Sequence, residues 1–498
     1  MSVADQILGA LGPLSILLIF VGVLTGMVIG AIPGLTATTA LILALPLTYT
    51  LAPAPAFQLL VAIYVGGISG GCISAILLRI PGTPSSIATT FDGFPMSQKG
   101  EAGRALGIAF FSSLVGTLFS CAVLVALAEP LARLALRFGP AEYFLIILLA
   151  LTSVVALAGS DPIRGYIAAV LGFMLATVGQ DQMSATVRIV GPDSPFAPGF
   201  AMIPTLIGLY GVSELVGNRG GGAMPGAVPL RGLLPDPRFV LSQGWNFLRS
   251  ATIGLVIGLI PAVGGNVANL VSYSQARRAS KTPERFGTGH PEGLVASETA
   301  NNAVIGGAII PLLALGIPGD AATAILFGAL LLHGLQPGPL VFASNPEAVY
   351  AIYVAVMVSG VAIFVIGIGL IRLFIAALRT PRAMLVPLVL VLCVVGAYAA
   401  DNSFNGIWVL LFFALVGLGA ERFGLPLAPM VIAIILGPIA EVNLRRALTA
   451  GRGDLAGFHD SLLSQLLLAM LALVIALSLR RALRTRRAAT RLLKESKR

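Results

Sequence analysis

The hydroxyl side chains best suited to binding an anion follow a Pro-Gly break in an apolar segment. Thr83, Ser85 and Ser86 come directly after Pro81 and Gly82. Such a break stops one helix, and the next helix begins with unsatisfied N–H groups at the positive end of its dipole. A helix start of this kind suits a carboxylate. We therefore expect these hydroxyls to bind an organic anion, with simple helix capping by Thr83 as the structural alternative.

One carboxylate follows the matching break later in the chain. Asp320 comes directly after Pro318 and Gly319, and no Lys or Arg occurs from 291 to 350. A carboxylate at membrane depth is costly unless it is paired or binds a cation. We expect Asp320, with Thr323, to bind a coupling Na⁺ or to carry a proton. The alternative is an N-cap at a water-filled turn.

The first break of each pair, at Pro33 and at Pro261, carries neutral oxygen ligands beside small residues. Gly34 is followed by Thr36 and Thr38, and the Pro261 break is followed by Gly264 with Asn266 and Asn269. Tight helix packing is the alternative at both tips. The expected substrate ligands are Thr36, Thr38, Thr83, Ser85, Ser86, Asn266, Asn301 and Asn302. The expected coupling-ion ligands are Asp320, Thr323, Gly34, Gly264 and Asn269. The expected hinges are Pro33, Pro81, Gly82, Pro261, Pro318 and Gly319.

Two charged residues near the breaks each allow two interpretations. Glu298 lies one helical turn from Asn301 and Asn302, which predicts a polar lining. It could instead pair with a loop arginine, Arg277 or Arg285. Arg79 directly precedes the first Ile-Pro-Gly break. It could neutralise an anionic substrate or extend to the nearer membrane interface.

The composition is that of a membrane protein. Hydrophobic residues make up 57% of the 498, charged residues 10%, and the mean hydropathy is +0.95; soluble domains carry about 25% charged residues. The apolar runs are long and do not alternate with polar residues, so they predict helices rather than barrel strands. We expect an all-α polytopic protein with about 10–12 membrane segments, including re-entrant hairpins. The cysteines Cys72, Cys121 and Cys393 lack metal-site spacing and are expected to be packed thiols.

The charge pattern predicts that two similar halves face opposite ways. The loop from Leu47 to Phe57, between the first two breaks, has no basic residue, whereas Arg277, Arg278, Lys281 and Arg285 lie between the second two. Cytoplasmic loops collect Lys and Arg, and inverted repeats with broken helices are typical of secondary transporters. On this hypothesis, Gln98 and Thr282 are reachable from the same, cytoplasmic side. Arg133, Arg137, Arg188, Arg445, Arg446 and Arg452 disagree with the scheme.

The repeat hypothesis divides the chain into four parts. Residues 1–216 form the first membrane repeat, 217–244 a cytoplasmic Gly/Pro-rich linker, 245–479 the second repeat, and 480–498 a basic tail. A basic segment beside a membrane helix indicates cytoplasmic placement against anionic lipid rather than nucleic-acid binding.

Long stretches of the chain closely resemble the large membrane subunit of the tripartite tricarboxylate transporter family (the TctA family). The likeness runs from about residue 10 to 475 and includes 30–39, 70–86 and 284–338, with Ser297–Asn302 and Ile317–Asp320. It implies a bacterial inner-membrane protein that works with a small four-helix membrane subunit and a periplasmic solute-binding protein. It also implies uptake of an organic carboxylate, such as citrate or a related di- or monocarboxylate, driven by an ion gradient.

Other classes of protein fit the sequence less well. The chain has no phosphate-binding Gly-x-x-x-x-Gly-Lys-Ser/Thr loop, no His-Glu-x-x-His and no Gly-x-Ser-x-Gly. We therefore expect no enzyme and no cofactor apart from a coupling Na⁺ or H⁺. An ion channel and a stand-alone carrier remain the alternatives, since inverted re-entrant hairpins occur in channels too.

Overall fold

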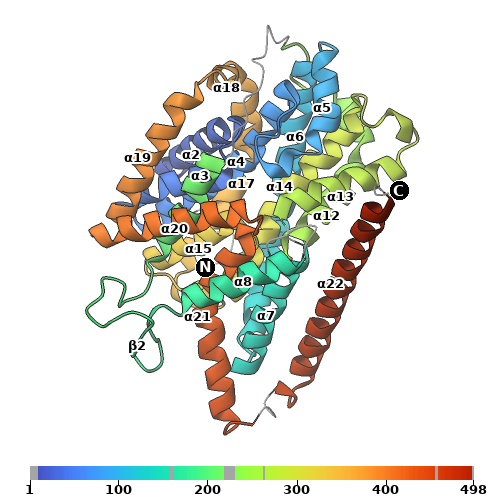
Figure 1. The fold of residues 1–498 in the computed structure, drawn as a ribbon. Coiled ribbons are helices and arrows are strands. Elements are labelled where there is room, and N and C mark those ends of the chain that lie inside the picture. The colour runs from blue at the N-terminus through green and yellow to red at the C-terminus, as the bar shows by residue number, and fades with distance from the viewer. Residues whose placement is uncertain (1–8, 158–161, 218–229, 262–263, 455–457, 496–498) are drawn as a thin grey trace. The chain divides into compact units, whose positions relative to one another are not determined.

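The computed structural model describes residues 9–157, 162–217, 230–261, 264–454 and 458–495, and these are overwhelmingly helical (Figure 1). Two short antiparallel strands, β1 (Gly179–Gln180) and β2 (Val187–Arg188), pair Gly179 with Arg188. The prediction of an all-α polytopic membrane protein is confirmed.

Eight of the described helices are long and apolar enough to cross a membrane. They are α2 (Pro13–Ala31), α4 (Pro53–Leu78), α6 (Ala102–Ala135), α14 (Pro291–Leu315), α17 (Pro346–Gly369), α19 (Arg382–Asp401), α20 (Phe404–Arg422) and α21 (Leu427–Ala450). Apolar side chains such as Leu17 in α2 and Val391 in α19 are exposed. Apolar patches on the outside of long helices are what lipid tails cover.

Shorter helices make up most of the remainder. The shorter apolar ones are α3 (Ala37–Ala44), α7 (Pro140–Leu157), α8 (Pro162–Ala176), α9 (Met202–Leu206), α15 (Ala321–Leu332) and the apolar first half of α22 (Leu462–Glu495). The others are α5 (Thr89–Gln98), α10 (Ser213–Gly217), α11 (Pro237–Ser242), α12 (Gly244–Gly258), α13 (Gly264–Ala279), α16 (Val341–Ser344) and α18 (Ile371–Ala377). Single turns are η1 (Leu45–Thr48), η2 (Pro84–Ser86) and η4 (Pro283–Arg285), and η3 (Ile207–Val212) is a π-helical segment.

The chain packs as two units, each drawn from both of its halves. Unit 1 comprises Met1–Arg133, Glu214–Leu259 and Val263–Ala399, and unit 2 comprises Leu134–Ser213, Ile260–Ala262 and Ala400–Arg498. The predicted repeats are consecutive stretches of the chain, whereas each unit combines segments from both halves. The division into two repeats stays a prediction. Residues 218–229 of the predicted linker lie outside the described residues.

Unit 1 contains the same order of elements twice. Helices α2 and α3 pack on α4, and helices α12 and α13 pack on α14 (Figure 1). Glycines bring the paired backbones into contact: a Cβ at Gly30 would lie 2.2 Å from Gly67 O, and one at Gly254 would lie 2.2 Å from Ala300 O. Small residues allow this close approach of membrane helices. That the two copies face opposite ways remains a prediction.

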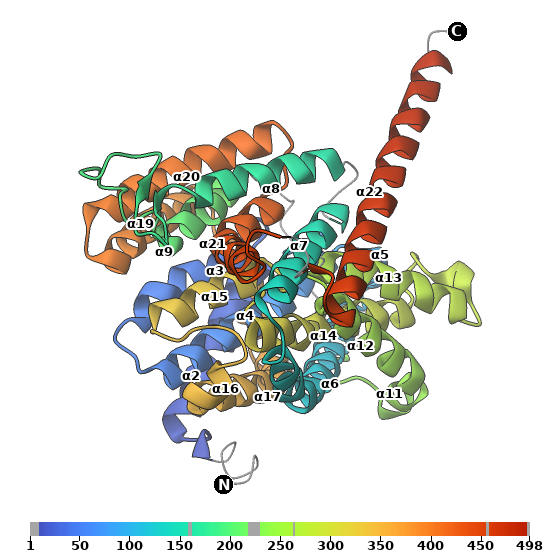
Figure 2. The ribbon, with the colours of Figure 1, turned by 90° about the horizontal axis from the view of Figure 1, so that it is seen from below.

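Unit 2 is built around α7, α8, α21 and α22. Its apolar core includes Ala141, Leu145, Ala447, Phe458 and Leu467. Figure 2 shows α22 as one unbroken helix, so the described part of the basic tail continues the last apolar helix. The π-helical segment packs on α20, where a Cβ at Gly208 would lie 2.5 Å from Leu410 O.

Two of the arginines that disagree with the predicted topology belong to an ion-pair cluster in unit 2. Arg188 lies 2.7 Å from Glu441, and Arg445 lies 2.7 Å from both Asp181 and Glu441. The backbone N–H groups of Met183 and Ser184, with Arg445, hold the pKa of Asp181 well below its usual range. Because the cluster contains two acids and two arginines, these arginines add no net positive charge to their loops and carry little topological information.

Candidate substrate and ion site

Asp320 caps α15 at the break that follows α14. Helix α14 ends at Gly316, which has a left-handed φ of 70°. The Asp320 carboxylate accepts hydrogen bonds from Thr323 N at 2.7 Å and Thr323 Oγ1 at 2.8 Å, and Asp320 N donates to Thr323 Oγ1 at 2.8 Å. This reciprocal arrangement is a capping box. The structure thus shows the N-cap that the sequence offers as the alternative for Asp320, and the binding of a coupling ion by Asp320 and Thr323 stays a prediction.

A tyrosine from the first copy completes the surroundings of Asp320. The Tyr64 hydroxyl, on α4, donates to Asp320 Oδ2 at 2.5 Å. Among the described residues, no Lys, Arg or His lies within ion-pair distance of this carboxylate. The donors that the described residues provide to the Asp320 carboxylate are therefore neutral.

The break after α4 has the same left-handed backbone conformation as the break after α14, but different side chains follow it. Helix α4 ends at Arg79, which has a left-handed φ of 60°. Gly82 then passes so close to its neighbours that a Cβ there would lie 2.3 Å from Gly30 O. Thr83 Oγ1 lies 3.0 Å from Ser85 Oγ and 2.9 Å from Ser86 Oγ. The three hydroxyls therefore form one buried cluster, as the hypothesis of a shared anion site requires.

The helix expected at Thr83 begins later than the sequence predicts. Residues 84–86 form the single 3₁₀ turn η2, and α5 starts only at Thr89. Pro84 disfavours the helical conformation at Thr83, and short hydroxyl side chains compete for the backbone. Thr83 makes no side-chain capping bond. The hydroxyls themselves, rather than a long helix N-terminus, are the groups that could receive a carboxylate here.

The start of α13 brings the two breaks together. A Cβ at Gly265 would lie 2.7 Å from both Asn301 Oδ1 and Ser85 Cβ, and one at Gly264 would lie 3.8 Å from Asp320 Cβ. The Asn269 amide donates to the backbone carbonyl of Ser85. Gly264, Asn269, Ser85, Asn301 and Asp320 therefore converge, although they lie far apart in the sequence.

Buried polar atoms without partners occur in this cluster. Asn269 Oδ1 makes no hydrogen bond within the described chain. The Asn301 side chain is 1% exposed and has no hydrogen bond of standard geometry there, and its amide lies next to the Glu298 carboxylate. Unsatisfied buried polar atoms are costly and call for an explanation, such as a ligand or an ion.

The other predicted ligands lie elsewhere in unit 1 or are oriented differently. Thr36 caps α3 through Thr39 at 3.4 Å, next to Gly34 with its positive φ of 92°. Thr38 is buried in α3, which packs on α15. Asn266 is exposed on α13, outside the converging cluster. Pro261 adjoins residues 262–263, so the tip of that break lies outside the described residues.

Glu298 and Asn302 form a second buried polar network at the middle of α14. Glu298 is 0% exposed and accepts hydrogen bonds from Thr89 Oγ1 and, at 3.5 Å, from Ser113 Oγ. Asn302 donates to Ser113 Oγ at 2.8 Å and accepts from Ser69 Oγ at 2.6 Å. Of the two interpretations of Glu298, the structure therefore bears out the polar lining and not the pairing with Arg277 or Arg285.

Asp92, which the sequence analysis did not single out, ties α5 to the loop before α14. Asp92 Oδ1 accepts hydrogen bonds from the N–H groups of Gly287 at 2.9 Å, Gly289 at 2.8 Å and His290 at 2.7 Å. Its Oδ2 accepts from the Tyr273 hydroxyl at 2.8 Å. In the sequence Asp92 is a single acid within Thr89–Gln98, and nothing there identifies its partners.

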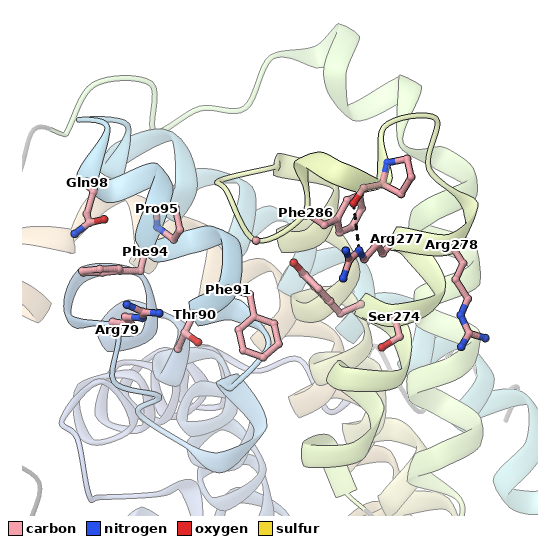
Figure 3. Close-up of a pocket in the computed structure, with 13 residues that line it drawn as sticks. Arg79, Thr90, Phe91, Phe94, Pro95, Gln98, Ser274, Arg277, Arg278 and Phe286 are labelled. Carbon is pink, nitrogen blue, oxygen red and sulfur yellow. Dashed lines mark hydrogen bonds between the residues drawn. The ribbon is translucent and has the colours of Figure 1, made fainter.

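The loops predicted to share the cytoplasmic side lie together. Lys99 Nζ donates to Thr288 O at 2.7 Å. Gln98 and Pro283 line a common cavity of about 1020 Å³ between α5 and α13 (Figure 3). Arg79 also lines it, exposed and 5.8 Å from the ring centroid of Phe94. The contact between these loops agrees with the expectation that Gln98 and Thr282 are reachable from one side.

A family model for the tripartite tricarboxylate transporter TctA family matches residues 16–432 of the chain. The chain belongs to this family. The TctA family provides the large subunit of a tripartite tricarboxylate transporter, so the chain is the multi-pass membrane subunit of such a system.

Two proteins of Agrobacterium vitis are similar to the chain. One is described as an uncharacterized 52.8 kDa protein in the TAR-I ttuC' 3' region; it is 33% identical over 484 residues, which cover 96% of each chain. The other is an uncharacterized protein in the TAR-II ttuC' 3' region, 32% identical over 234 residues that cover 47% of this chain and 97% of the relative.

Proposed function

We propose that the chain is the permease of a binding-protein-dependent carrier that imports an organic carboxylate across the bacterial inner membrane. The transported solute would be a tricarboxylate such as citrate, or a related di- or monocarboxylate. A periplasmic solute-binding protein would deliver it, a small four-helix membrane subunit would complete the complex, and the basic C-terminal helix would lie in the cytoplasm. Membership of the TctA family supports this assembly.

The observation that carries the proposal is the meeting of Asp320 with the hydroxyl cluster of the first break through the start of α13. Gly264 approaches Asp320, while Gly265 and Asn269 contact Ser85. Small residues at this point let backbone and neutral oxygens come close to a ligand. A cation and a carboxylate held a short distance apart would neutralise each other, which lowers the cost of burying either one.

The roles we assign follow from charge. Asp320 is a carboxylate with only neutral donors, so it would bind the coupling Na⁺ or H⁺, with Thr323 holding its orientation. Thr83, Ser85, Ser86 and the Asn301 amide offer hydroxyl and N–H donors, which suit the carboxylate of the solute. Breaks at Gly82 and Gly319 would let the helix ends move between outward-open and inward-open states.

Reconstituted transport tests the proposal. The chain and its small subunit are placed in liposomes, the cognate binding protein loaded with radiolabelled citrate is added outside, and an inward Na⁺ gradient or pH gradient is imposed. Saturable accumulation that needs both the binding protein and one of the gradients is expected. Uptake that persists without the binding protein would indicate a stand-alone carrier. Non-saturable flux without accumulation would indicate a channel and would refute the proposal.

A further inference from the structure

We infer that the cavity between α5 and α13 is a second binding site for a small, multiply charged carboxylate, occupied by the solute after it leaves the helix breaks. The inference rests on the proposed function, because it names the place from which the transported anion is released. The cavity is lined by residues from both copies: Thr90, Phe94 and Gln98 from α5, and Ser274 and Arg277 from α13.

The charged residues that line the cavity are all positive. Arg79, Arg277 and Arg278 line it, and no Asp or Glu does. Figure 3 shows Arg79 on one wall, beside Phe94, and the two other arginines on the helix that forms the opposite wall. None of the three lies within ion-pair distance of a carboxylate in the described part of the chain. Unpaired guanidinium groups facing a concave site attract an anion and can bind its carboxylates in pairs of hydrogen bonds.

A buried acid close to the cavity, Asp92, binds the loop at 287–290 and Tyr273 rather than the arginines. Both oxygens of Asp92 are taken up by backbone N–H groups of the loop and by the Tyr273 hydroxyl. Arg277 uses only Nε within the protein, donating to Pro283 O at 3.2 Å. Its terminal nitrogens make no hydrogen bond to described residues and are available to a ligand.

One face of helix α13 runs from the helix breaks to the cavity. On α13, Gly265, Asn269 and Tyr273 follow one another at intervals of four residues and therefore share one helix face. The first two contact Ser85, and Tyr273 lines the cavity. On α5, Thr89 bonds to the buried Glu298, and the next residue, Thr90, lines the cavity. The hydroxyl cluster and the arginines of the cavity therefore lie along the same face of α13.

The cavity has room for a small organic acid together with water. A volume of about 1020 Å³ holds such an anion with part of its water shell. The aromatic walls are rigid: Tyr273 contacts Phe286 and Phe91 with ring centroids 5.4 Å and 5.3 Å apart. Phe94 supports the Arg79 guanidinium through a cation–π contact.

Thiol protection tests the site on the full chain. Ser274→Cys puts a thiol in the cavity wall, while the native cysteines are all buried. The variant is purified into nanodiscs of phosphatidylcholine and labelled with a charged maleimide at rising citrate concentration, with sodium sulfate as the ionic-strength control. Citrate should slow the labelling at concentrations where sulfate does not. Gln98→Cys provides a second reporter on the facing wall.

Charge variants test whether the arginines cause the protection by citrate. Arg79→Gln with Arg277→Gln should raise the citrate concentration for half protection roughly tenfold or more, since each removes a charge-assisted contact. Arg285→Gln removes one positive charge at an exposed residue of η4 that is outside the lining, so protection should be unchanged. Absence of protection at both reporters, or protection unaffected by the double variant, would overturn the inference.

Two further outcomes distinguish a solute site from a lipid site and from a failure of transport itself. If phosphatidylglycerol in the nanodisc blocks labelling and citrate does not, the cavity binds a lipid headgroup and the inference is wrong. If protection fails while liposome uptake still requires the binding protein and an ion gradient, the second site is refuted and the proposed function stands.

Discussion

The break after α4 and the break after α14 end their helices in the same way and then present opposite chemistry. Both helices finish on a left-handed residue, Arg79 or Gly316. After the first break, three hydroxyls contact one another, and the following helix starts several residues later. After the second, Asp320 caps α15 at once.

This difference indicates that the two similar breaks suit different ligands. Hydroxyls can donate to an anion but carry no charge, so they can bind and release a carboxylate without a large electrostatic cost. A carboxylate without a basic partner attracts a cation or a proton. The comparison is therefore the reason that we propose solute contacts at the first break and ion contacts at the second.

The largest expected effect comes from Asp320→Asn. Asn caps a helix about as well as Asp, so α15 should stay intact and membrane insertion should be unchanged. Without the negative charge, gradient-driven uptake should fall to the background of empty liposomes. Near-normal uptake with an unchanged ion dependence would remove the proposed distinction between the breaks.

Adding one methyl group at either break should reduce the amount of folded protein. A Cβ in Gly82→Ala would lie 2.3 Å from Gly30 O, and one in Gly319→Ala would lie 2.6 Å from Ala308 Cα. We expect a loss of about 1–3 kcal/mol in each, measured as the monodisperse fraction after heating in detergent. Gly244→Ala, which has no atom within 4 Å of its Cβ, should behave like the wild type. Stable Gly82→Ala protein would argue against tight packing at the first break.

Tyr64→Phe removes the hydroxyl that donates to Asp320 and should weaken ion coupling. A hydrogen bond to a charged group contributes about 1.5–3 kcal/mol, so the ion concentration for half-maximal uptake should shift roughly tenfold. The matched control is Tyr353→Phe, since the buried Tyr353 hydroxyl makes no hydrogen bond to described residues. An equal shift in both variants would mean that the effect is one of packing rather than of Asp320.

The smallest effect is expected from Ser85→Ala with Ser86→Ala. Thr83 and the Asn301 amide remain, so the KM for citrate should rise only severalfold while the ion dependence stays constant. Ser359→Ala, another buried serine whose hydroxyl has no partner within the described chain, is the control. An unchanged KM would leave these hydroxyls as structural groups, and a changed ion dependence would contradict the assignment of ions to the second break.

Much of this arrangement could be predicted because the signals are local. Pro-Gly pairs mark the ends of α4 and α14, and an acidic residue followed by Thr323 is a recognisable cap. The burial of Cys72 and the other cysteines follows from their apolar surroundings and is confirmed. The late start of α5 was not predicted, because the effect of Pro84 on Thr83 competed with the helix-start signal.

Contacts between distant residues could not be predicted from one sequence. Tyr64 and Asp320 are separated by 256 positions, and Asp92 and Gly289 by 197. Neither tyrosine spacing nor an isolated aspartate carries information about such a partner. The same limit applies to Arg188 and Arg445, whose ion pairs with acids elsewhere in unit 2 account for their disagreement with the charge rule.

The bonds of Asp92 have a mechanical consequence. Three N–H groups of the loop at 287–290 converge on one of its oxygens, and Tyr273 binds the other. Breaking several such bonds together is far more costly than breaking one. A tilt of α5 would therefore pull on the start of α14 and on α13 at the same time. Motion that begins in the first copy would in this way be transmitted to both helices of the second.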